Sequence, residues 1–548
     1  MDFNELAEIL FPNVDKAPEY YEKLYPPRNL DKNVKVTRPA PSPTGFIHLG
    51  TLFITVTDER LAHQSGGVLY IRIDDTDAKR EVEGGVEAII SGLEYFGIKF
   101  DEGTLTDGDK GGYGPYRQRQ RKEIYQTFAK YLVSIGKAYP CFCGADDLSE
   151  IRREQKEIKA TTGYYGKWAK CRNLKTEEIK KALKEGKPFV LRYFSTGDET
   201  KTVKFHDELR GEIRFPEYSH DDVLLKSDGI PTYHLAHVID DHLMRTTHVV
   251  RAEEWLSSVP YHMELFKAFD WDMPKYVHTA QVMKMDGASK RKLSKRKDPE
   301  ISLDFYKEQG YPKDAVIEYL LTILNSNYEQ WRLENPLKPY TEFKFTVEKM
   351  SASGMLFDIL KLDDISRNTI ALYTVEKVYD EVAGWSLKYD GELHGLLTRD
   401  RDYAMRIFSV GRNVPKPRKD ITKWSGVREY ISFFYDELFK IKDEYPANTD
   451  NNDVKKILEK YIDVYDPADD RTEWFNKIRT LTNDCGFCGD MKEYKKEPEK
   501  YRGNVCDVSA VIRIAVIGRT NSPDMYELFD ILGYERVKQR LLAALDRK

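Results

Sequence analysis

The stretch from Val34 to Asp77 constrains the fold of this chain more than any other part. It runs from a short apolar segment at 34–36, through the loop R-P-A-P-S-P-T-G-F-I-H-L-G at 38–50, to helix-like sequence at 51–64. The buried-strand run V-L-Y-I-R-I follows and ends in D-D-T-D. A strand, a glycine-containing loop, a helix and a second strand with acids at its carboxyl end are typical of the first half of a doubly wound nucleotide fold. The predicted fold class is therefore α/β, of the Rossmann type.

The proline-rich loop allows two interpretations. Pro41 and Pro43 stiffen the backbone, and Gly45 permits a turn that most residues cannot make. Gly50 lets the next helix begin close to a ligand, where free N–H groups and the helix dipole favour an anion, and His48 is placed to hydrogen-bond a phosphate oxygen. Considered alone, the loop favours the plainer interpretation, a rigid turn whose histidine is incidental.

A second loop, K-M-D-G-A-S-K-R-K-L-S-K-R-K at 284–297, is rich in glycine and lysine. Such a run is usually a solvated charged segment. The functional interpretation is a mobile loop that brings ammonium groups to a polyphosphate. Phosphoryl and nucleotidyl transfer depend on positioning the phosphates and on neutralising their charge, and lysines can do both.

Together the two loops resemble the signatures of class I aminoacyl-tRNA synthetases, with H-L-G-T at 48–51 as the HIGH motif and K-L-S-K-R at 292–296 as KMSKS. The closer resemblance is to bacterial-type glutamyl-tRNA synthetases. It is carried by P-S-P-T-G-F-I-H-L-G, G-G-V-L-Y-I-R-I-D-D-T-D, Y-G-P-Y-R-Q-R-Q-R, P-T-Y-H-L-A-H-V-I-D-D-H-L-M, V-V-R-A-E-E-W-L and K-L-S-K-R-K, which follow the family's order over most of residues 35–305.

The resemblance implies roles for particular residues. Arg38 pairs with the substrate γ-carboxylate, as a planar bidentate donor can, although an interior Arg–Asp ion pair is the structural alternative. Asp74, where bacterial-type glutamyl enzymes usually carry Glu, faces the α-ammonium group. The remaining implied sites are catalytic (His48, Thr44, Lys295), amino-acid-binding (Ser42, Tyr233, Arg251) and ATP-binding (Gly45, His48, Gly50, Lys292, Ser294, Lys295).

The implied reaction uses ATP with Mg²⁺ to activate L-glutamate as the adenylate and then transfers it to tRNA-Glu, with tRNA-Gln left open as a second acceptor. A glutaminyl-tRNA synthetase is the nearest alternative, and Asp74 is the residue that keeps it open, because the glutaminyl enzymes carry Asp there. A catalytically silent tRNA-binding adaptor is the alternative from another class. Retention of His48 and Lys295 argues against it.

The expected domain order follows the family. It comprises an N-terminal extension (1–33), the first half of the Rossmann catalytic domain (34–117), an inserted α+β acceptor-binding domain (118–221), the second half (222–280), the KMSKS loop with a stem-contact region (281–365), and an all-α anticodon-binding domain (366–548). Aromatic residues in the last part are expected to be mostly core, so no anticodon-reading residue is assigned.

Two groups of cysteines raise the question of a metal. Cys141, Cys143 and Cys171 resemble the zinc knuckle of some family members, but Asn173 stands where the last ligand is usually His. Tyr164 or Tyr165, with Tyr165 preferred, is a possible fourth ligand for Zn²⁺, and three reduced structural cysteines are an equal alternative. Cys485, Cys488 and Cys506 offer three thiols and no fourth ligand.

Length, composition and net charge limit the class of protein to which this chain can belong. A chain of 548 residues is too long for one core, and 41% hydrophobic with 32% charged residues describes a globular protein. The sequence has no run of about 18 apolar residues and opens without the features of a signal peptide, so a cytoplasmic protein with no membrane partner is expected. A monomer is expected as well. A net charge of -5 excludes a bulk polycation but not a basic face that binds nucleic acid.

Overall fold

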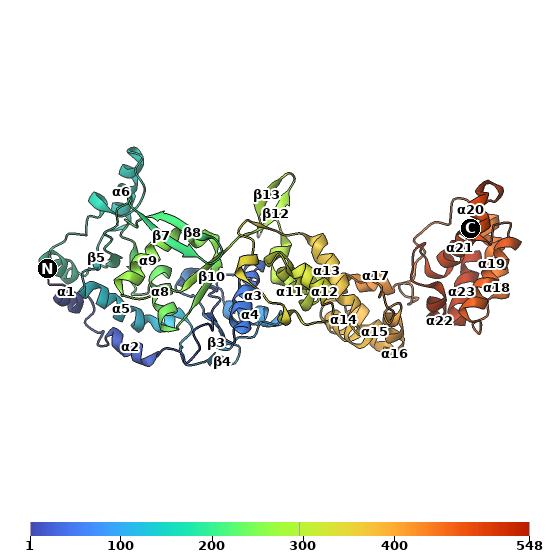
Figure 1. The fold of residues 1–548 in the computed structure, drawn as a ribbon, viewed down its shortest axis with the longest axis horizontal. Helices are drawn as coiled ribbons and strands as arrows, with labels where there is room; N and C mark the ends of the chain where they lie inside the picture. The colour runs from blue at the N-terminus through green and yellow to red at the C-terminus, as the bar shows by residue number, and fades with distance from the viewer. Residues whose placement is uncertain (1, 46, 295, 547–548) are drawn as a thin grey trace. The chain divides into compact units, whose positions relative to one another are not determined.

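The computed structural model describes residues 2–45, 47–294 and 296–546 (Figure 1). The chain forms two compact units. The first comprises residues 1–306 and 316–359, and the second comprises residues 307–315 and 360–548.

A parallel sheet begins the first unit. Strands β1 (Val36–Thr37), β2 (Val68–Ile71) and β3 (Glu102–Leu105) are parallel neighbours, and β4 (Gly108–Lys110) closes the edge antiparallel to β3. Leu69, Tyr70 and Ile71 are fully buried, as expected of a strand covered on both faces.

The sheet continues on the other side of β1. Strands β10 (His248–Ala252) and β11 (Lys275–Thr279) are parallel, and β11 is followed at the edge by the hairpin β7 (Thr202–Asp207) and β8 (Gly211–Pro216). The Thr247 N–H donates to the Val36 carbonyl oxygen at 3.0 Å, which joins β10 to β1. Across the sheet the strands lie in the order β3-β2-β1-β10-β11. From β1 the chain order runs outward to β2 and β3 on one side and to β10 and β11 on the other. A doubly wound sheet binds its ligands at the point where the strand order reverses in this way.

Helices cover this sheet and connect its strands. They are α3 (Leu49–Gln64), α4 (Gly85–Tyr95), α5 (Lys122–Ser134), α8 (Tyr233–Leu243) and α9 (Val259–Ala268). The N-terminal helices α1 (Phe3–Leu10) and α2 (Pro18–Leu24) pack against α5. Leu6, Leu10 and Tyr21 share one buried cluster with Phe128, so the N-terminal segment is part of the core of this unit.

The segment between the two halves of the sheet forms a small α+β layer of its own. Its strands β5 (Ala138–Cys141), β6 (Val190–Tyr193) and β9 (Val223–Leu225) are antiparallel, and its helices are α6 (Ala145–Glu157) and α7 (Thr176–Lys184). β9 lies in the stretch expected to open the second half of the catalytic sheet, and it pairs with β6 instead. Three apolar residues fit either sheet, so periodicity cannot distinguish them.

A hairpin of β12 (Val282–Asp286) and β13 (Ser289–Lys292), with β14 (Met355–Leu356) parallel to β12, carries the second glycine- and lysine-rich loop. Figure 1 shows the hairpin standing out from its surroundings. The chain continues with α10 (Leu303–Gln309), α11 (Lys313–Leu324) and α12 (Tyr328–Glu334), of which α10 and α11 each cross from one unit to the other along the chain.

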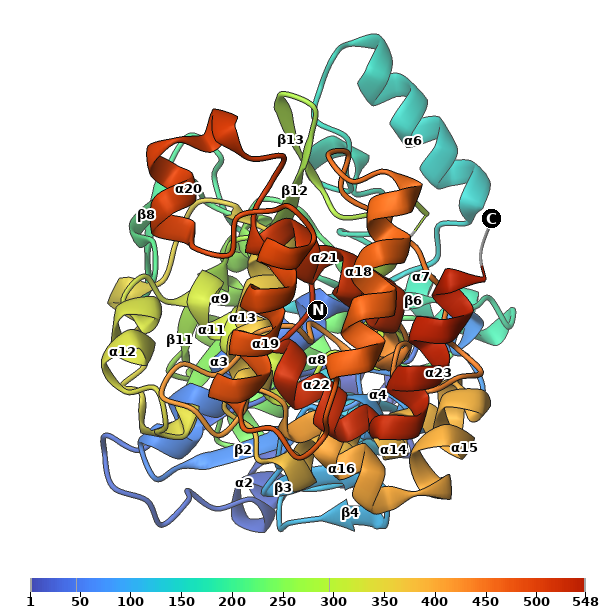
Figure 2. The same cartoon turned by 90° about the vertical axis from the view of Figure 1, so that its right-hand side faces the viewer.

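Helices are the regular elements of the second unit, which contains no strand among its described residues. Its helices are α13 (Ile359–Ala371), α14 (Val375–Tyr389), α15 (Gly391–Arg399), α16 (Arg401–Ser409), α17 (Val427–Ile431), α18 (Asn451–Val464), α19 (Arg471–Asp484), α20 (Met491–Lys496), α21 (Val505–Ile517), α22 (Met525–Leu532) and α23 (Tyr534–Leu545). Helix α21 contacts α18, α19 and α23 (Figure 2). Its Val508, Val511 and Ile512 are fully buried, so α21 is the centre of this bundle.

The local predictions near the proline-rich loop are close to the structure. The helix expected at 51–64 begins at Leu49, and the strand expected at 34–36 is Val36–Thr37. None of the helices in the described part of the chain combines the length and the apolar character that crossing a membrane requires.

Candidate active site

The carboxyl ends of β1 and β10 bring the predicted site residues to the switch point of the sheet. Arg38 follows β1 directly, and Arg251 is the fourth residue of β10. Both side chains belong to nearly buried residues, 3% and 5% exposed. Because ligands of doubly wound sheets bind where the strand order reverses, the two arginines mark the candidate site.

Arg38 is held by Asp241 of α8. Its Nε and Nη2 donate to the two carboxylate oxygens, each at 2.9 Å, which is the bidentate geometry that a guanidinium favours. The interior Arg–Asp pair that the sequence left as an alternative is thus present. The guanidinium has further N–H donors beyond these two bonds, so pairing with Asp241 does not exhaust its capacity for an anionic ligand.

Asp241 belongs to a larger buried charge network. Arg72 donates from Nη1 to Asp241 at 2.9 Å and from Nε to Asp74 at 2.8 Å. Arg121 pairs with the neighbouring Asp240 at 2.7 Å. Three arginines thus face three aspartates inside the unit, which fits the rule that buried charges are paired.

The network shifts the pKa of its carboxyl groups in opposite directions. Burial opposes ionisation of Asp241, but Arg38 and Arg72 outweigh it and hold the pKa of Asp241 well below its ordinary value. Burial raises the pKa of Asp74 to about 6, with Arg72 acting against the shift. Asp74 therefore titrates close to neutral pH, while Asp241 stays charged.

Arg251 differs from Arg38 in the kind of partner it has. It donates to His278 Nε2 at 2.9 Å and to the Tyr233 hydroxyl at 3.3 Å, and its Nη2 lies 3.4 Å from the Trp255 carbonyl oxygen. Burial lowers the pKa of His278, so this imidazole is neutral near pH 7. Among the described residues Arg251 has no carboxylate partner, so it is a buried cation without a counter-ion.

A stacked pair of rings connects the two arginines. His237 and Tyr233, one turn apart on α8, stack with centroids 5.5 Å apart and planes inclined by 7°. His237 Nδ1 lies 2.6 Å from Asp241, and its Nε2 lies 2.9 Å from the Tyr276 hydroxyl. Burial lowers the pKa of His237 to about 3, so the ring is neutral and can donate to Asp241 while it accepts from Tyr276.

The proline-rich loop ends in a helix cap made by the predicted histidine. His48 is the N-cap of α3, and its Nδ1 accepts the Thr51 N–H at 3.2 Å. A neutral ring in this state carries its proton on Nε2, which is the donor a phosphate oxygen requires. A Cβ at Gly50 would lie 3.1 Å from His48 Nδ1, and Gly45 has φ 147°, so both positions favour glycine.

The other predicted residues of this loop lie just before it. Ser42 is exposed, and its carbonyl oxygen accepts the Thr44 N–H at 2.8 Å. Both residues lie in the same turn as Gly45, ahead of the α3 N-terminus.

The second loop is tied to the segment that follows β10. The Lys292 ammonium lies 2.8 Å from the Glu254 carboxylate, and both side chains are about half exposed. The Ser294 N–H donates to Asp298 at 2.8 Å. Lys295, to which the sequence assigns a catalytic role, lies outside the described residues. The chain after the loop returns to the first loop, since Ser302 forms an antiparallel bridge with His48.

The first cysteine group is assembled as a cluster. The sulfur atoms of Cys141, Cys143 and Cys171 lie within 4.8 Å of one another. The Tyr164 hydroxyl lies 3.4 Å from Cys141 Sγ and 3.3 Å from Cys143 Sγ. The preferred fourth residue, Tyr165, instead donates to the Thr161 carbonyl oxygen at 2.7 Å. Adjacent residues point in different directions here, and only Tyr164 faces the thiols.

The second cysteine group is not assembled in this way. Cys485 and Cys488 are buried and Cys506 is exposed. Within the described residues the only grouping of potential metal ligands is the one at Cys141, Cys143 and Cys171.

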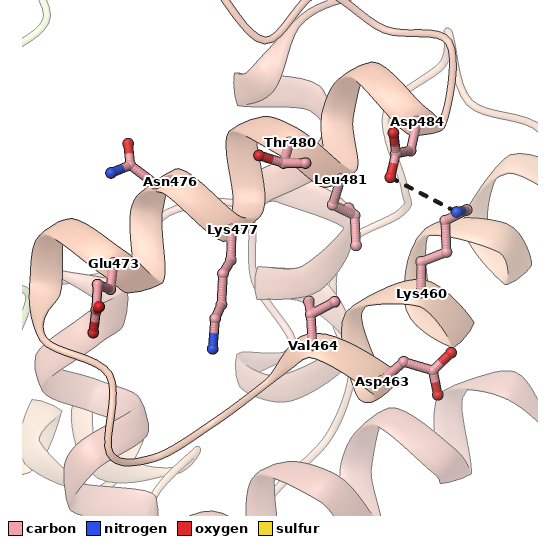
Figure 3. A pocket seen from close by; sticks show the side chains of 9 residues that line it. All are labelled: Lys460, Asp463, Val464, Glu473, Asn476, Lys477, Thr480, Leu481 and Asp484. Atoms are coloured by element: carbon pink, nitrogen blue, oxygen red, sulfur yellow. Dashed lines mark ion pairs between the residues drawn. The ribbon is translucent and has the colours of Figure 1, made fainter.

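The helical unit has a hollow of its own, of about 420 Å³, between α18 and α19 (Figure 3). Its lining residues are mostly charged or polar: Lys460, Asp463, Val464, Glu473, Asn476, Lys477, Thr480, Leu481 and Asp484. In Figure 3 Lys460 and Asp484 form an ion pair across it, at 3.9 Å.

Comparison with known proteins identifies the family. The family model described as "tRNA synthetases class I (E and Q), catalytic domain" matches residues 34–364. This chain belongs to that family. A second model, "Anticodon binding domain", matches residues 493–545. The family and the α/β fold with a helical C-terminal domain, both predicted from the sequence, are confirmed.

Full-length relatives agree with this membership. The synthetase is 52% identical over 542 residues to a protein of Acetivibrio thermocellus named glutamate–tRNA ligase, with 99% of each chain covered. It is 47% identical to a glutamate–tRNA ligase of Clostridium perfringens (strain 13), with 99% of this chain and all of the other covered. A solved glutamate–tRNA ligase of Elizabethkingia meningosepticum, in complex with its amino acid, superposes with a TM-score of 0.75 at 25% identity and covers 94% of this synthetase and 99% of that chain.

Some residues of the site were not singled out from the sequence. Asp241 and His237 stood within the quoted motif A-H-V-I-D-D-H-L-M without a role. Their i,i+4 spacing on a helix places them on one face, which was an available signal. Glu254, in the quoted V-V-R-A-E-E-W-L, had no such signal in the sequence. Nothing in that motif indicates that its partner is Lys292, nearly forty residues later.

Proposed function

We propose that this chain is a glutamate–tRNA ligase that activates L-glutamate with ATP and transfers it to the 3′-terminal adenosine of tRNA-Glu. The observation that carries the proposal is Arg251, a buried arginine at the strand-order reversal whose partners in the described chain are all neutral. An anionic side chain supplies the missing counter-ion, and a neutral amide such as glutamine does not. The names of the full-length relatives support the same substrate.

The site residues divide between the two substrates. Arg251 and the outer N–H groups of Arg38 bind the γ-carboxylate, Tyr233 contributes its hydroxyl, and Asp74 faces the α-ammonium group. Ser42 contacts polar groups of the amino acid. On the ATP side, Gly45, Gly50 and the N-terminus of α3 cradle the phosphates, Thr44 lies beside them, and Lys292 and Ser294 approach from the second loop.

The reaction is an in-line substitution followed by acyl transfer. An α-carboxylate oxygen of glutamate attacks the α-phosphorus of ATP, the bond to the β-phosphate oxygen breaks, and pyrophosphate leaves. His48 donates from Nε2 to a phosphate oxygen, and Lys295 neutralises charge in the transition state. Mg²⁺ on the ATP phosphates adds further charge neutralisation. The terminal ribose hydroxyl of tRNA then attacks the mixed anhydride, and AMP departs.

The remaining segments bind tRNA in this proposal. The inserted segment, 118–221, holds the acceptor end, residues 281–365 contact the stem, and residues 366–548 reach the anticodon. The match of 493–545 to an anticodon-binding family supports the last assignment. The hollow between α18 and α19 offers Asn476 and Thr480, side chains that can hydrogen-bond base edges.

The cysteine cluster fits a zinc ion. In tetrahedral zinc sites the metal–sulfur distance of about 2.3 Å sets neighbouring ligand atoms about 3.8 Å apart. The observed spacing of 3.6 Å between Cys143 Sγ and Cys171 Sγ, and of 3.3 to 3.4 Å from the Tyr164 hydroxyl, is close to that requirement. Cys141, Cys143, Cys171 and Tyr164 would hold the ion, which would stabilise the inserted segment without taking part in the reaction.

Metal analysis tests the zinc assignment. The purified protein is expected to carry about one zinc per chain, and Cys171→Ser is expected to lose it. Tyr164→Phe is expected to lower zinc affinity about 10-fold to 100-fold, whereas Tyr165→Phe is the matched control and is expected to retain the metal. Absence of zinc from the wild-type protein, or equal retention by both tyrosine variants, would overturn the assignment.

ATP–pyrophosphate exchange tests the main proposal. Exchange is measured with glutamate or glutamine, each with and without purified tRNA-Glu and tRNA-Gln. Glutamate-dependent exchange that requires tRNA-Glu is expected, and added tRNA-Gln shows whether the enzyme accepts both. Exchange with glutamine and none with glutamate would contradict the proposal, and tRNA binding with no exchange at all would favour the silent adaptor.

A further inference from the structure

The six residues of the K-L-S-K-R-K loop lie between two residues that are paired with each other. Arg291 precedes the loop and Asp298 follows it. Arg291 Nη1 lies 2.5 Å from Asp298 Oδ2, and Arg291 Nη2 lies 2.8 Å from Asp298 Oδ1. This bidentate pair closes the loop at its base, because it fixes both the separation and the orientation of the two ends.

The arrangement is built around the carboxylate of Asp298, whose side chain is only 1% exposed. Arg291 and Lys284 are directly opposite each other on the hairpin strands β13 and β12. Like charges in that position repel each other. Here both face Asp298, with Lys284 Nζ at 3.5 Å, and Lys284 also pairs with the buried Glu300.

Asp298 also reaches into the loop itself. It accepts the Ser294 N–H at 2.8 Å, and the Asp298 N–H donates to the Ser294 carbonyl oxygen at 2.9 Å. On the other side, Arg291 Nε donates to Asp286 at 2.8 Å, which ties the pair to the hairpin. The hydrogen bonds from Arg291 lower the pKa of Asp298, so this carboxylate is charged at neutral pH.

The pair is also connected to the histidine loop. Only a short turn, Pro299–Ile301, separates Asp298 from Ser302, which bridges His48, and the Leu303 N–H donates to the Ile47 carbonyl oxygen at 3.3 Å. The base of the lysine loop and the N-cap of α3 are therefore joined by a few residues of fixed backbone.

We propose that Arg291 and Asp298 are positioning residues that hold the lysine loop in register with the histidine loop, so that its cations meet the ATP phosphates. The proposal rests on the proposed function for its effect on catalysis. An isolated ion pair at a surface contributes little, but this pair shares a buried carboxylate with Lys284 and with a backbone N–H of the loop.

Kinetics of exchange provide the first test, with the full-length enzyme and its tRNA. Arg291→Met and Asp298→Asn are each expected to lower kcat about 10-fold to 100-fold and to raise the KM for ATP, with the KM for glutamate within about 2-fold of wild type. The double variant is expected to be no worse than the more severe single variant, because both remove the same constraint. Lys290→Met, which removes an exposed cation from the same strand, is the matched control and is expected to behave as wild type.

Cleavage by trypsin provides a second test that does not depend on activity. The loop contains several lysines and arginines, so release of its base is expected to speed cleavage within residues 290–297 at least about 5-fold in Asp298→Asn, with thermal stability as the check on folding. If the wild-type enzyme lacks glutamate-dependent exchange, the proposed function is wrong. The cleavage rates alone then show whether the Arg291–Asp298 pair holds the loop. Unchanged cleavage, or a kinetic effect no larger than that of Lys290→Met, would overturn the positioning role.

Discussion

Two regions of this molecule use the same charged residue types in different surroundings. In the catalytic unit, the side chains of Arg38 and Asp241 are 3% and 0% exposed and form a bidentate pair. In the hollow of the helical unit, the side chains of Lys460 and Asp484 are 42% and 55% exposed and only 3.9 Å apart. Burial, rather than the presence of an ion pair, therefore decides what a substitution costs in stability.

The comparison also gives the reason for placing the proposed ligand site at Arg251. In the buried network nearly every cation has its carboxylate, so the exception, Arg251, is informative. In the hollow the charges are hydrated and screened, so an unpaired side chain there indicates much less.

The largest effect is expected at Asp241. Asp241→Asn leaves Arg38 buried without its counter-ion and removes one of the carboxylate partners of Arg72, which keeps Asp74. The free energy of unfolding is therefore expected to fall by about 3–5 kcal/mol in denaturant titrations. Asp463→Asn, which removes an exposed charge from the hollow, is the control and is expected to change it by less than about 0.5 kcal/mol. Similar losses of unfolding free energy in the two variants would contradict the conclusion that burial decides the cost of a substitution.

Arg251→Met is expected to separate binding from stability. Because no carboxylate of the described chain is left unpaired, the free energy of unfolding is expected to change by less than about 1 kcal/mol. The kcat/KM for glutamate in the exchange reaction is expected to fall about 100-fold. The exposed Arg214, replaced in the same way, is expected to alter neither quantity. A large loss of stability with little loss of exchange would mean that Arg251 has a structural role.

Within the buried network, Asp74 and Asp241 are expected to affect stability differently as the pH changes, because their pKa values are shifted in opposite directions. Its pKa in the folded protein, about 6, lies above the ordinary value of a free carboxyl group, so the folded state holds the proton longer than the unfolded state. The unfolding free energy is therefore expected to decrease as the pH rises from about 4 to about 6, by at most about 3 kcal/mol, and Asp74→Asn is expected to remove this decrease.

The same titration affects binding. In the proposed site the Asp74 carboxylate binds the substrate ammonium group. On that proposal the KM for glutamate is expected to fall as the pH rises through about 6 in the wild type and to stay flat in Asp74→Asn. Asp77, whose side chain is 43% exposed and whose pKa Arg80 lowers by a hydrogen bond, is the matched control. An Asp74→Asn enzyme with the wild-type pH profile would exclude Asp74 from ammonium binding.

The smallest effect is expected in the hollow. Asp484→Asn removes the partner of Lys460 and is expected to change the unfolding free energy by less than about 0.5 kcal/mol. A shift in affinity for tRNA without any shift in stability would show that the hollow contacts RNA. A loss of more than about 1 kcal/mol of unfolding free energy would mean that this exposed pair stabilises the fold as the buried pairs do.

Features that depend on consecutive residues could be predicted from the sequence. The histidine loop, the strand before it and the helix after it could be predicted because proline, glycine and apolar spacing act locally. The partner of Arg38 could not, since Asp241 is 203 residues away in the chain. The choice of Tyr164 over Tyr165 depends on which neighbouring ring faces the thiols, and the α18–α19 hollow depends on how two helices pack. Neither leaves a pattern in the sequence.

The bond between Thr247 and Val36 has a consequence for synthesis. These residues are 211 positions apart, and their pairing joins the two halves of the catalytic sheet. At about 5–20 residues per second, a ribosome needs about 10 to 40 s to make the chain between them. During that interval β1 is a sheet edge without its second neighbour, exposed to pairing with other chains. The first half of the catalytic sheet therefore has an unpaired edge at β1 until the chain beyond Thr247 has been made.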